Sequence, residues 1–186
     1  MIKRASARAS IRQERACAAG WEKMMAMAQT FRPTRTMRLG TALLKALLRA
    51  GAPMGSLTLL SVQGRKSGKV YTSPVALVHQ GHERWLVAAF GEVNWVRNLR
   101  VAGAAYLIRG SHTERIGVVE VGMTEAAPIL QRFLQAYHLV PFIAPYFSVT
   151  PTSPRAAFER EAMRHPVFRI VATNEERRRQ TRHAWQ

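Results

Sequence analysis

The chain has 186 residues, 47% of them hydrophobic, and a formal net charge of +17. This length suits one domain with a core. The lack of any aspartate excludes Asp-based catalytic and calcium sites. The single cysteine, Cys17, excludes an internal disulfide framework and fits a reducing cytoplasm. The positive charge favours a polyanion, an anionic lipid surface or a negatively charged small ligand as partner, and does not choose among them.

Residues 1–35 are basic and show no apolar period, so they are interpreted as a mobile extension. Thr36 is placed to cap a helix over Met37–Ala50, and Gly51 is placed to end it. The leucines of this helix recur at helical spacing and are expected to pack on the sheet, although the basic residues beside them leave a peripheral membrane contact open. The stripe consists of Leu39, Leu43, Leu44, Leu47 and Leu48.

Two strands, Ser56–Val62 and Tyr71–Val78, flank a short basic turn that runs from Gly64 to Lys69. Its two glycines allow a positive φ and the close approach of a ligand to the backbone. Cations, free N–H groups and a hydroxyl on such a turn form a concave anion site. The plain alternative is a solvated hairpin turn that is basic by composition.

The remaining elements alternate short strands with a few helices, which predicts an α+β fold, a small barrel with helices at its rim. The short helix that Ser153 and Pro154 open is expected to turn Phe158 and Met163 inward, and residues 174–186 are expected to form a charged tail. In chain order the predicted elements are a hairpin turn at Gln80–His82, a strand at Arg84–Phe90, a helix at Asn94–Val101, strands at Ala105–Arg109 and Arg115–Val121, a helix at Glu125–Leu139 capped by Thr124, an aromatic loop at Phe142–Phe147, and a last strand at Pro166–Val171.

Several familiar chemistries find no support in the sequence. The basic turn is not a phosphate loop of the GxxxxGK[ST] kind, because its spacing is one residue short and a strand follows it. No Ser/His/Asp triad is available without an aspartate. The histidines are scattered and are interpreted as surface or turn residues, so no metal site is expected. If the protein is an enzyme, a cofactor must supply the chemistry. The histidines are His79, His82, His112, His138, His165 and His183.

Four segments in order, Leu60–Lys69, Thr72–Pro74, Trp85–Ala89 and Asn94–Arg100, resemble the deazaflavin-dependent nitroreductase and F420H2-dependent quinone reductase family. The resemblance runs from about Thr36 to Ile170. It implies one domain over residues 36–173 with a split β-barrel of the FMN-binding-like kind, flanking helices and a homodimeric assembly. It also implies that a groove of the barrel holds coenzyme F420.

The resemblance also implies which residues hold the cofactor, and it implies no catalytic residue and no metal ligand. The basic turn would bind the anionic phosphate and glutamyl tail, the second strand would run beside the cofactor, and residues 88–91 would lie near the deazaflavin ring, with the short helix closing the site. The expected cofactor-binding residues are Arg65, Lys66, Ser67, Tyr71, Thr72, Ser73, Pro74, Val75, Ala76, Ala88, Ala89, Phe90, Gly91, Asn94, Trp95, Val96, Arg97 and Asn98.

The sequence departs from the family pattern at three of these positions. Tyr71 stands where relatives often have a second arginine, so tail binding is expected to use Lys69 as well. Ala76 and Phe90 replace polar residues that the nitroreductase type uses near its substrate. Nitroimidazole reduction is therefore not expected. Three aromatic residues are candidate walls of the substrate pocket: Tyr137, Tyr146 and Phe147.

The function that the resemblance implies is hydride transfer from reduced coenzyme F420 to an electron-poor small molecule such as a quinone, with the protein supplying orientation and electrostatics. Two alternatives stay open, an FMN-binding oxidoreductase on the same barrel and a non-catalytic basic module that binds nucleic acid or anionic membrane. The F420-dependent function predicts a cytoplasmic homodimer without a nucleic-acid partner. Membrane association through the helix 37–50 remains an open alternative.

Overall fold

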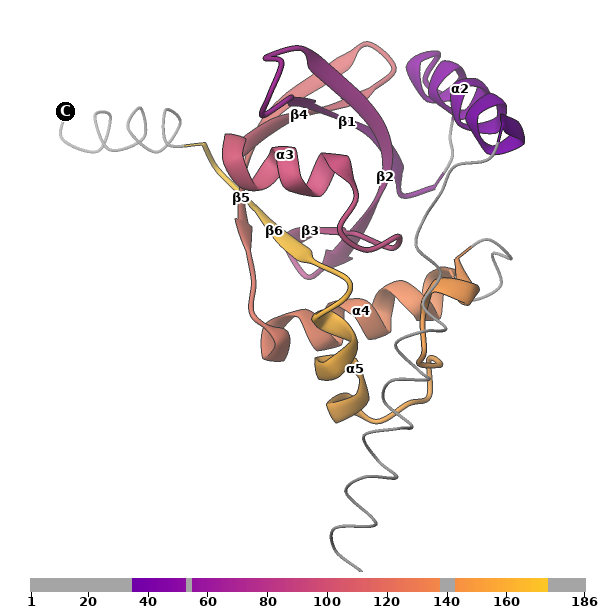
Figure 1. The fold of residues 1–186 in the computed structure, drawn as a ribbon, viewed down its shortest axis with the longest axis vertical. Coiled ribbons are helices and arrows are strands. Elements are labelled where there is room, and N and C mark those ends of the chain that lie inside the picture. Colours follow the sequence, from indigo (N-terminus) through magenta and orange to yellow (C-terminus); the bar gives the residue numbers. More distant parts are fainter. Residues whose placement is uncertain (1–34, 53–54, 138–142, 174–186) are drawn as a thin grey trace, which may run out of the picture.

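Six antiparallel strands close into a barrel in the order β1-β2-β3-β6-β5-β4 (Figure 1). The computed structural model describes residues 35–52, 55–137 and 143–173. Figure 1 shows α3 across one end of the barrel, α2 outside it, and α4 with α5 below. The elements are α2 (Arg35–Arg49), β1 (Leu57–Gln63), β2 (Val70–Gln80), β3 (Glu83–Val87), α3 (Asn94–Ala102), β4 (Ala104–Arg109), β5 (His112–Glu120), α4 (Met123–Tyr137), the 3-10 helix η1 (Ala144–Tyr146), α5 (Arg155–Ala162) and β6 (Val167–Val171).

The barrel interior is filled by the apolar side chains that alternate along the strands, because successive residues of a strand point to opposite faces. Helix α3 closes this core, since its apolar face carries Trp95, Val96 and Leu99 into the same cluster. The Trp95 ring lies 6.0 Å from that of Phe168 on β6. Other members of this cluster are Leu60, Val62, Val75, Leu86, Leu107 and Ile116.

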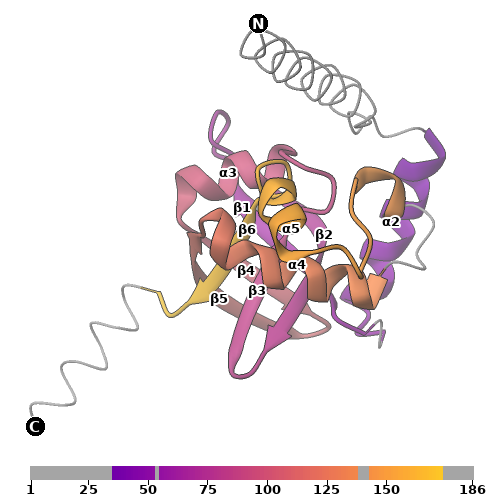
Figure 2. The same ribbon diagram turned by 90° about the horizontal axis from the view of Figure 1, so that it is seen from below.

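A second core lies outside the barrel, where α4 and α5 pack on the outer side chains of β2, β3 and β6 (Figure 2). Phe133 of α4 and Phe158 of α5 are fully buried here beside Trp85 and Val87 of β3. The two cores share the wall of the barrel. Strand β3 therefore has an apolar side chain on each face, as expected for a strand that is covered on both sides.

The α+β fold predicted from the sequence, a split β-barrel with flanking helices, is confirmed. Several local predictions are wrong. Thr124 is not the cap of the helix that was predicted from Glu125, because α4 begins at Met123 and contains Thr124. The strand predicted over 84–90 ends at Val87. The Ala88 N–H still bonds to the carbonyl of Pro166, but the Ala88 carbonyl accepts from the N–H of Gly91 and residues 89–92 turn away. Met163 does not turn inward with Phe158. It follows the last turn of α5 and is 59% exposed.

Helix α2 begins at Arg35, which precedes the expected cap at Thr36, and the chain leaves it through Gly51 at φ 81°. Its leucine stripe was expected to pack on the sheet, and it does so only in part. Leu48 is fully buried, whereas Leu43 is 63% and Leu47 is 40% exposed. The helix lies on the outside of a curved wall, so a wide apolar stripe cannot be covered along its whole width.

The predictions for the basic extension, the charged tail, Cys17 and His138 fall outside the described residues, apart from position 35. Within the described ranges, no helix is both long and apolar enough to cross a bilayer.

Candidate functional site

The predicted basic turn is a short, internally bonded loop between β1 and β2. The N–H of Gly64 donates to the carbonyl of Lys69 at 2.8 Å, and the N–H of Gly68 donates to the carbonyl of Gly64 at 2.9 Å. Gly68 has φ 66°, the left-handed conformation that the sequence predicted for a glycine here. Gly64 is needed for a different reason, because a Cβ on it would come within 2.5 Å of the Tyr71 ring.

One arginine holds the turn against α3. Both the backbone N–H and the guanidinium of Arg65 donate to Oδ1 of Asn98, at 3.3 Å and 2.9 Å. Asn98 lies on the inner face of α3 and is 4% exposed. Arg65 and Asn98 were both expected to contact a cofactor directly. The structure gives them a shared positioning contact, which fixes the turn relative to the end of the barrel.

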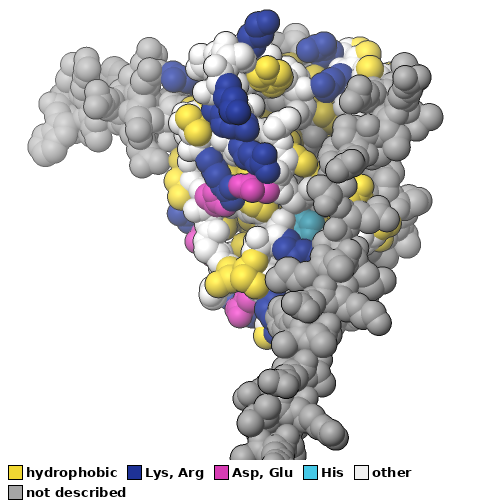
Figure 3. Space-filling view, viewed as in Figure 1, with side chains coloured by type: hydrophobic (Ala, Val, Ile, Leu, Met, Phe, Trp, Pro, Cys, Tyr) yellow, Lys and Arg dark blue, Asp and Glu magenta, His cyan; other side chains and the backbone are white. Residues whose placement is uncertain are grey.

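The other two cations of the turn point to solvent. Within the part of the chain that the structure describes, the ammonium groups of Lys66 and Lys69 make no hydrogen bond or ion pair, and both residues are exposed. Ser67 lies between them, with its hydroxyl 3.2 Å from the Tyr71 hydroxyl. Figure 3 shows Lys and Arg side chains gathered over α3 and the upper rim of the barrel, with acidic side chains below them. The turn is therefore able to offer two unpaired cations to an anion.

Strand β2 divides its predicted site residues between its two faces. Val75 belongs to the barrel core. Tyr71 and Ser73 also face the barrel side, because residues two and four positions apart on a strand lie on the same face. The alternate residues Thr72, Pro74 and Ala76 lie on the opposite, outer face and form a row of short, half-buried side chains.

The outer row of β2 lies between two helices, because α2 and α4 each contact this strand. At its upper end, the Thr72 hydroxyl lies 2.7 Å from that of Ser61 on β1. At its lower end, Ala76 packs on the second core. The basic turn stands directly before this row in sequence and in space. Together they form a path from exposed cations to small apolar side chains.

Residues 88–91 form a tight turn after β3. Ala88 is 1% exposed and belongs to the barrel core, so its side chain does not face an outer ligand. Ala89 and Phe90 are half-buried on the outside. The N–H of Gly91 donates to the carbonyl of Ala88 at 2.9 Å, and Gly91 has φ 72°. This is the segment that was expected to lie beside a planar ring.

The predicted residues of α3 have mixed positions. Trp95 and Val96 are buried in the barrel core, so both side chains pack inward. Asn94 and Arg97 are exposed, and the Arg97 guanidinium lies 3.7 Å from the Glu92 carboxylate. Of the five predicted site residues on this helix, only these two present a side chain to solvent.

The predicted aromatic wall lies next to the 88–91 turn. The Tyr146 ring packs edge-on against Phe90, with centroids 5.0 Å apart and an interplanar angle of 87°. Phe147 and Tyr137 both pack on Phe133 of α4, at 5.8 Å and 4.9 Å. All three aromatic side chains are half-buried. The turn and the loop around η1 therefore meet through aromatic contacts.

Sequence reasoning missed His165, which was interpreted as a surface or turn residue. It is 2% exposed, and its two ring nitrogens lie 3.0 Å from the carbonyl oxygens of Ala88 and Tyr146. The Glu161 carboxylate lies 3.3 Å from Nε2. The sequence held one signal for this contact, since Glu161 and His165 are four residues apart, the spacing at which side chains meet on a helix.

Burial raises the pKa of Glu161, but hydrogen bonds from His165 and from the hydroxyl and N–H of Ser148 outweigh it and lower that pKa to about 2. No group of three metal-ligating side chains occurs in the described residues.

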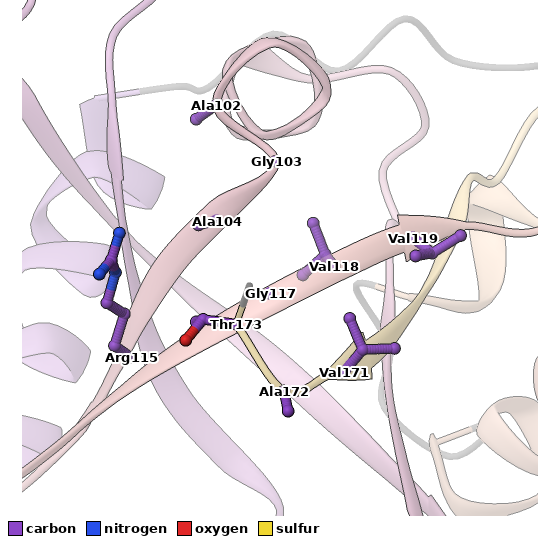
Figure 4. A pocket seen from close by; sticks show the side chains of 10 residues that line it. All are labelled: Ala102, Gly103, Ala104, Arg115, Gly117, Val118, Val119, Val171, Ala172 and Thr173. Carbon is purple, nitrogen blue, oxygen red and sulfur yellow. The ribbon is translucent and has the colours of Figure 1, made fainter. Parts of the chain in front are cut away.

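A separate open cavity of about 560 Å³ lies between the C-terminal end of α3, the strand β5 and the end of β6 (Figure 4). Small residues line most of it, with Arg115 at one side. None of the predicted site residues is among the described residues that line it. Its lining consists of Ala102, Gly103, Ala104, Arg115, Gly117, Val118, Val119, Val171, Ala172 and Thr173.

Comparison with known proteins adds a family to this geometry. A sequence model described as F420H(2)-dependent quinone reductase matches residues 35–135. No curated protein gives a significant match.

Three solved structures are similar over most of their own length. An F420-H2 dependent reductase, FDR-A, shares 20% identity over 62% of this chain and 94% of its own, with a TM-score of 0.43. A protein described as a putative 5-nitroimidazole antibiotic resistance protein from Bacteroides thetaiotaomicron shares 12% identity over 68% and 78%, with a TM-score of 0.43. A putative pyridoxamine 5'-phosphate oxidase from Listeria innocua shares 9% identity over 70% and 90%, with a TM-score of 0.43.

Proposed function

Because the chain belongs to the F420H(2)-dependent quinone reductase family, whose cofactor is coenzyme F420, we propose that it transfers a hydride from reduced coenzyme F420 to an electron-poor acceptor of the quinone type. The observation that carries this proposal is the path from the exposed lysines of the basic turn to the short side chains on the outer face of β2. A long anionic tail and a planar ring need those two features side by side.

The cofactor tail binds at the basic turn in this proposal. Its negative charges meet the ammonium groups of Lys66 and Lys69, and charge-assisted hydrogen bonds of this kind are the strong ones. The Arg65–Asn98 contact fixes the turn before a ligand arrives, so less conformational freedom is lost on binding. Lys69 thus takes the role of the second arginine that Tyr71 replaces.

The residues that would hold the deazaflavin ring are those of the outer row of β2 and residues 89–90. Thr72, Pro74 and Ala76 are short enough to leave room for a flat tricycle against the strand. Ala89 and Phe90 would bound its far end, since Ala89 is half-buried beside the second core and the half-buried Phe90 packs on Tyr146. The predicted residues that face the barrel interior support the strand from behind and contribute no side-chain contact.

Reduced coenzyme F420 supplies the hydride, and the residues of this chain supply position and environment. The outer row of β2 would hold the ring. Phe90 and Tyr146 pack on one another at the ring end and exclude water from the place where the acceptor arrives. No protein nucleophile takes part, and the rate depends on the distance and alignment of donor and acceptor.

An apolar, electron-poor acceptor fits the residues at the ring end. Ala76 and Phe90 offer no hydrogen-bond donor from their side chains, and Tyr146 adds a half-buried aromatic face. A flat apolar molecule such as a quinone stacks on such a face. A nitroimidazole that needs polar side chains at these two positions is a poor substrate by the same argument.

Titration of the purified protein with coenzyme F420 and with FMN, followed by tryptophan fluorescence, tests the proposal. We expect clear preference for F420, and we expect Lys66→Ala to weaken it about tenfold to hundredfold, the effect of losing a charge-assisted contact of ~1.5–3 kcal/mol. Arg132→Ala, at an exposed position on α4, is the control for loss of one positive charge. Equal or tighter binding of FMN at physiological salt would refute the proposal.

Two assembly predictions accompany this function. The homodimer implied by the family resemblance is checked by sedimentation velocity. The peripheral membrane contact is supported by the exposed Leu43 and Leu47 of α2, which lie beside Lys45 and Arg49. Flotation with anionic vesicles checks it, and Leu43→Ser with Leu47→Ser is expected to reduce the bound fraction.

A further inference from the structure

A buried histidine connects the two segments that meet at the ring end of the site. Nδ1 of His165 lies 3.0 Å from the carbonyl oxygen of Ala88, in the 88–91 turn. Nε2 lies 3.0 Å from the carbonyl oxygen of Tyr146, in the loop around η1. The ring also stacks on Phe147, with centroids 4.0 Å apart and planes 13° from parallel. Every direction in which the imidazole can bond is therefore occupied by one segment or the other.

Both contacts are hydrogen bonds only when both ring nitrogens carry a proton. A carbonyl oxygen only accepts hydrogen bonds, and a neutral imidazole has one donor nitrogen and one acceptor nitrogen. A neutral ring would therefore turn a lone pair toward one of the two carbonyls at 3.0 Å. The imidazolium donates to both, and its charge also favours the face of the Phe147 ring.

The neighbouring groups supply the charge that an imidazolium needs when it is buried. Glu161 is 3% exposed and its carboxylate lies 3.3 Å from Nε2. Ser148 donates to both oxygens of that carboxylate, from its N–H at 3.1 Å and its hydroxyl at 2.5 Å. The Arg164 guanidinium, 3.9 Å from Glu161, is the other charged group that faces this pair among the described residues.

We propose that His165, as an imidazolium paired with Glu161, is a positioning residue for hydride transfer: it holds the 88–91 turn and the loop around η1 at a fixed separation, and thereby sets where ring and acceptor meet. The Ala88 carbonyl accepts from both His165 and the N–H of Gly91, so the histidine bonds directly to the atom that closes this turn. The inference rests on the proposed function for the reaction, whereas the contacts of His165 do not depend on that function.

The first test needs no cofactor. In long-range proton–nitrogen correlation spectra of the free protein, His165 should show both ring nitrogens protonated at neutral pH. Glu161→Gln keeps the size of the side chain and removes its charge, so the second proton should be lost. The Gly91 amide should then exchange with solvent roughly threefold to tenfold faster, as when one hydrogen bond is weakened. A neutral His165 ring in the parent, or an unchanged Gly91 amide in the variant, overturns the proposal.

The second test separates positioning from cofactor binding. His165→Gln and Glu161→Gln should lower kcat with a quinone by about tenfold to hundredfold, as misplaced reacting groups do, while the Kd for coenzyme F420 changes less than about twofold. Phe158→Leu, a cavity-forming change in the same layer, should leave kcat unchanged. An unchanged kcat in both histidine-pair variants, or a loss confined to F420 affinity, contradicts a positioning role. Failure of the parent to bind F420 is a different result and removes the proposed function itself.

Discussion

Replacement of Glu161 by glutamine should change how the stability of this protein depends on pH. Glu161 is almost fully buried on α5. Burial raises the pKa of its carboxyl group, and hydrogen bonds from His165 and Ser148 outweigh that effect and lower it to about 2, against an ordinary 4.5. The folded state therefore favours the carboxylate more than the unfolded state does.

The sign and size of the effect follow from this difference. A carboxyl group with a lowered pKa in the folded protein contributes stability above its unfolded pKa, and that stability is lost as the pH falls toward its folded pKa. The difference between 4.5 and about 2 corresponds to ~3 kcal/mol at neutral pH, at about 1.4 kcal/mol for each pH unit. By pH 3 about 2 kcal/mol of this contribution should be gone.

Urea unfolding of the parent protein and of Glu161→Gln at pH 7 and at pH 3 measures this contribution. We expect the difference in free energy of unfolding between the two proteins to shrink by about 2 kcal/mol on acidification, since all other carboxylates titrate in both. Glu114→Gln is a useful comparison, because the Arg84 guanidinium lowers the pKa of Glu114 at a more exposed position, so the change should have the same sign and be smaller. A difference that is equal at both pH values would refute the reasoning.

Three further changes test the parts of the site separately. Asn98→Ala removes the acceptor of both Arg65 hydrogen bonds, so it should lower the free energy of unfolding by about 1–3 kcal/mol and weaken F420 binding, as a denaturant titration and a fluorescence titration would show. Gly91→Ala forces a Cβ onto a residue at φ 72° and to 3.2 Å from the carbonyl oxygen of Arg164, so a loss of about 1–2 kcal/mol is expected, and a melting temperature equal to the parent's would contradict it. Trp95→Ala empties part of the barrel core and should cost about 3–5 kcal/mol, whereas a Trp95 that served mainly the cofactor would give a stable protein with poor binding.

The barrel was predictable because its strands are short, alternate regularly and are joined by turns rich in glycine. The limits of β1, β2 and β6 differ from the predicted ones by at most two residues at each end. The end of β3 was not predictable in this way. Ala88–Phe90 continues the apolar pattern, but the residue opposite Ala88 on the neighbouring strand is Pro166, far away in sequence, which has no N–H to donate in return.

The basic turn was predictable as a feature and less so in its details. Its glycines and cations stand out in the sequence, but the partner of Arg65 is a side chain on α3, 33 residues away. Alternation along β2 could have separated Thr72 from Tyr71, since period two places neighbours on opposite faces. The family resemblance named a continuous stretch, and the structure divides it between two faces.

The spacing of Glu161 and His165 indicated one contact of His165, but its burial could not be predicted from local pattern. A histidine between Arg164 and Pro166 resembles many surface turns, and it is buried by Ala88, Tyr146 and Phe147, which belong to two segments far from it in sequence. The exposure of Leu43 and Leu47 was not predicted for a different reason. Helical spacing identifies an apolar stripe, and it does not tell how much of that stripe the rest of the fold covers.

The central claim is that coenzyme F420 binds between the basic turn and the outer face of β2. Titration of nitrogen-15-labelled protein with F420, followed amide by amide, tests it most directly. We expect the shifts to gather at residues 65–69, at Thr72 and Ala76, and at residues 89–91. Shifts that gather instead around the cavity near Gly103, Gly117 and Val171, or no saturable shifts at all, would contradict the account.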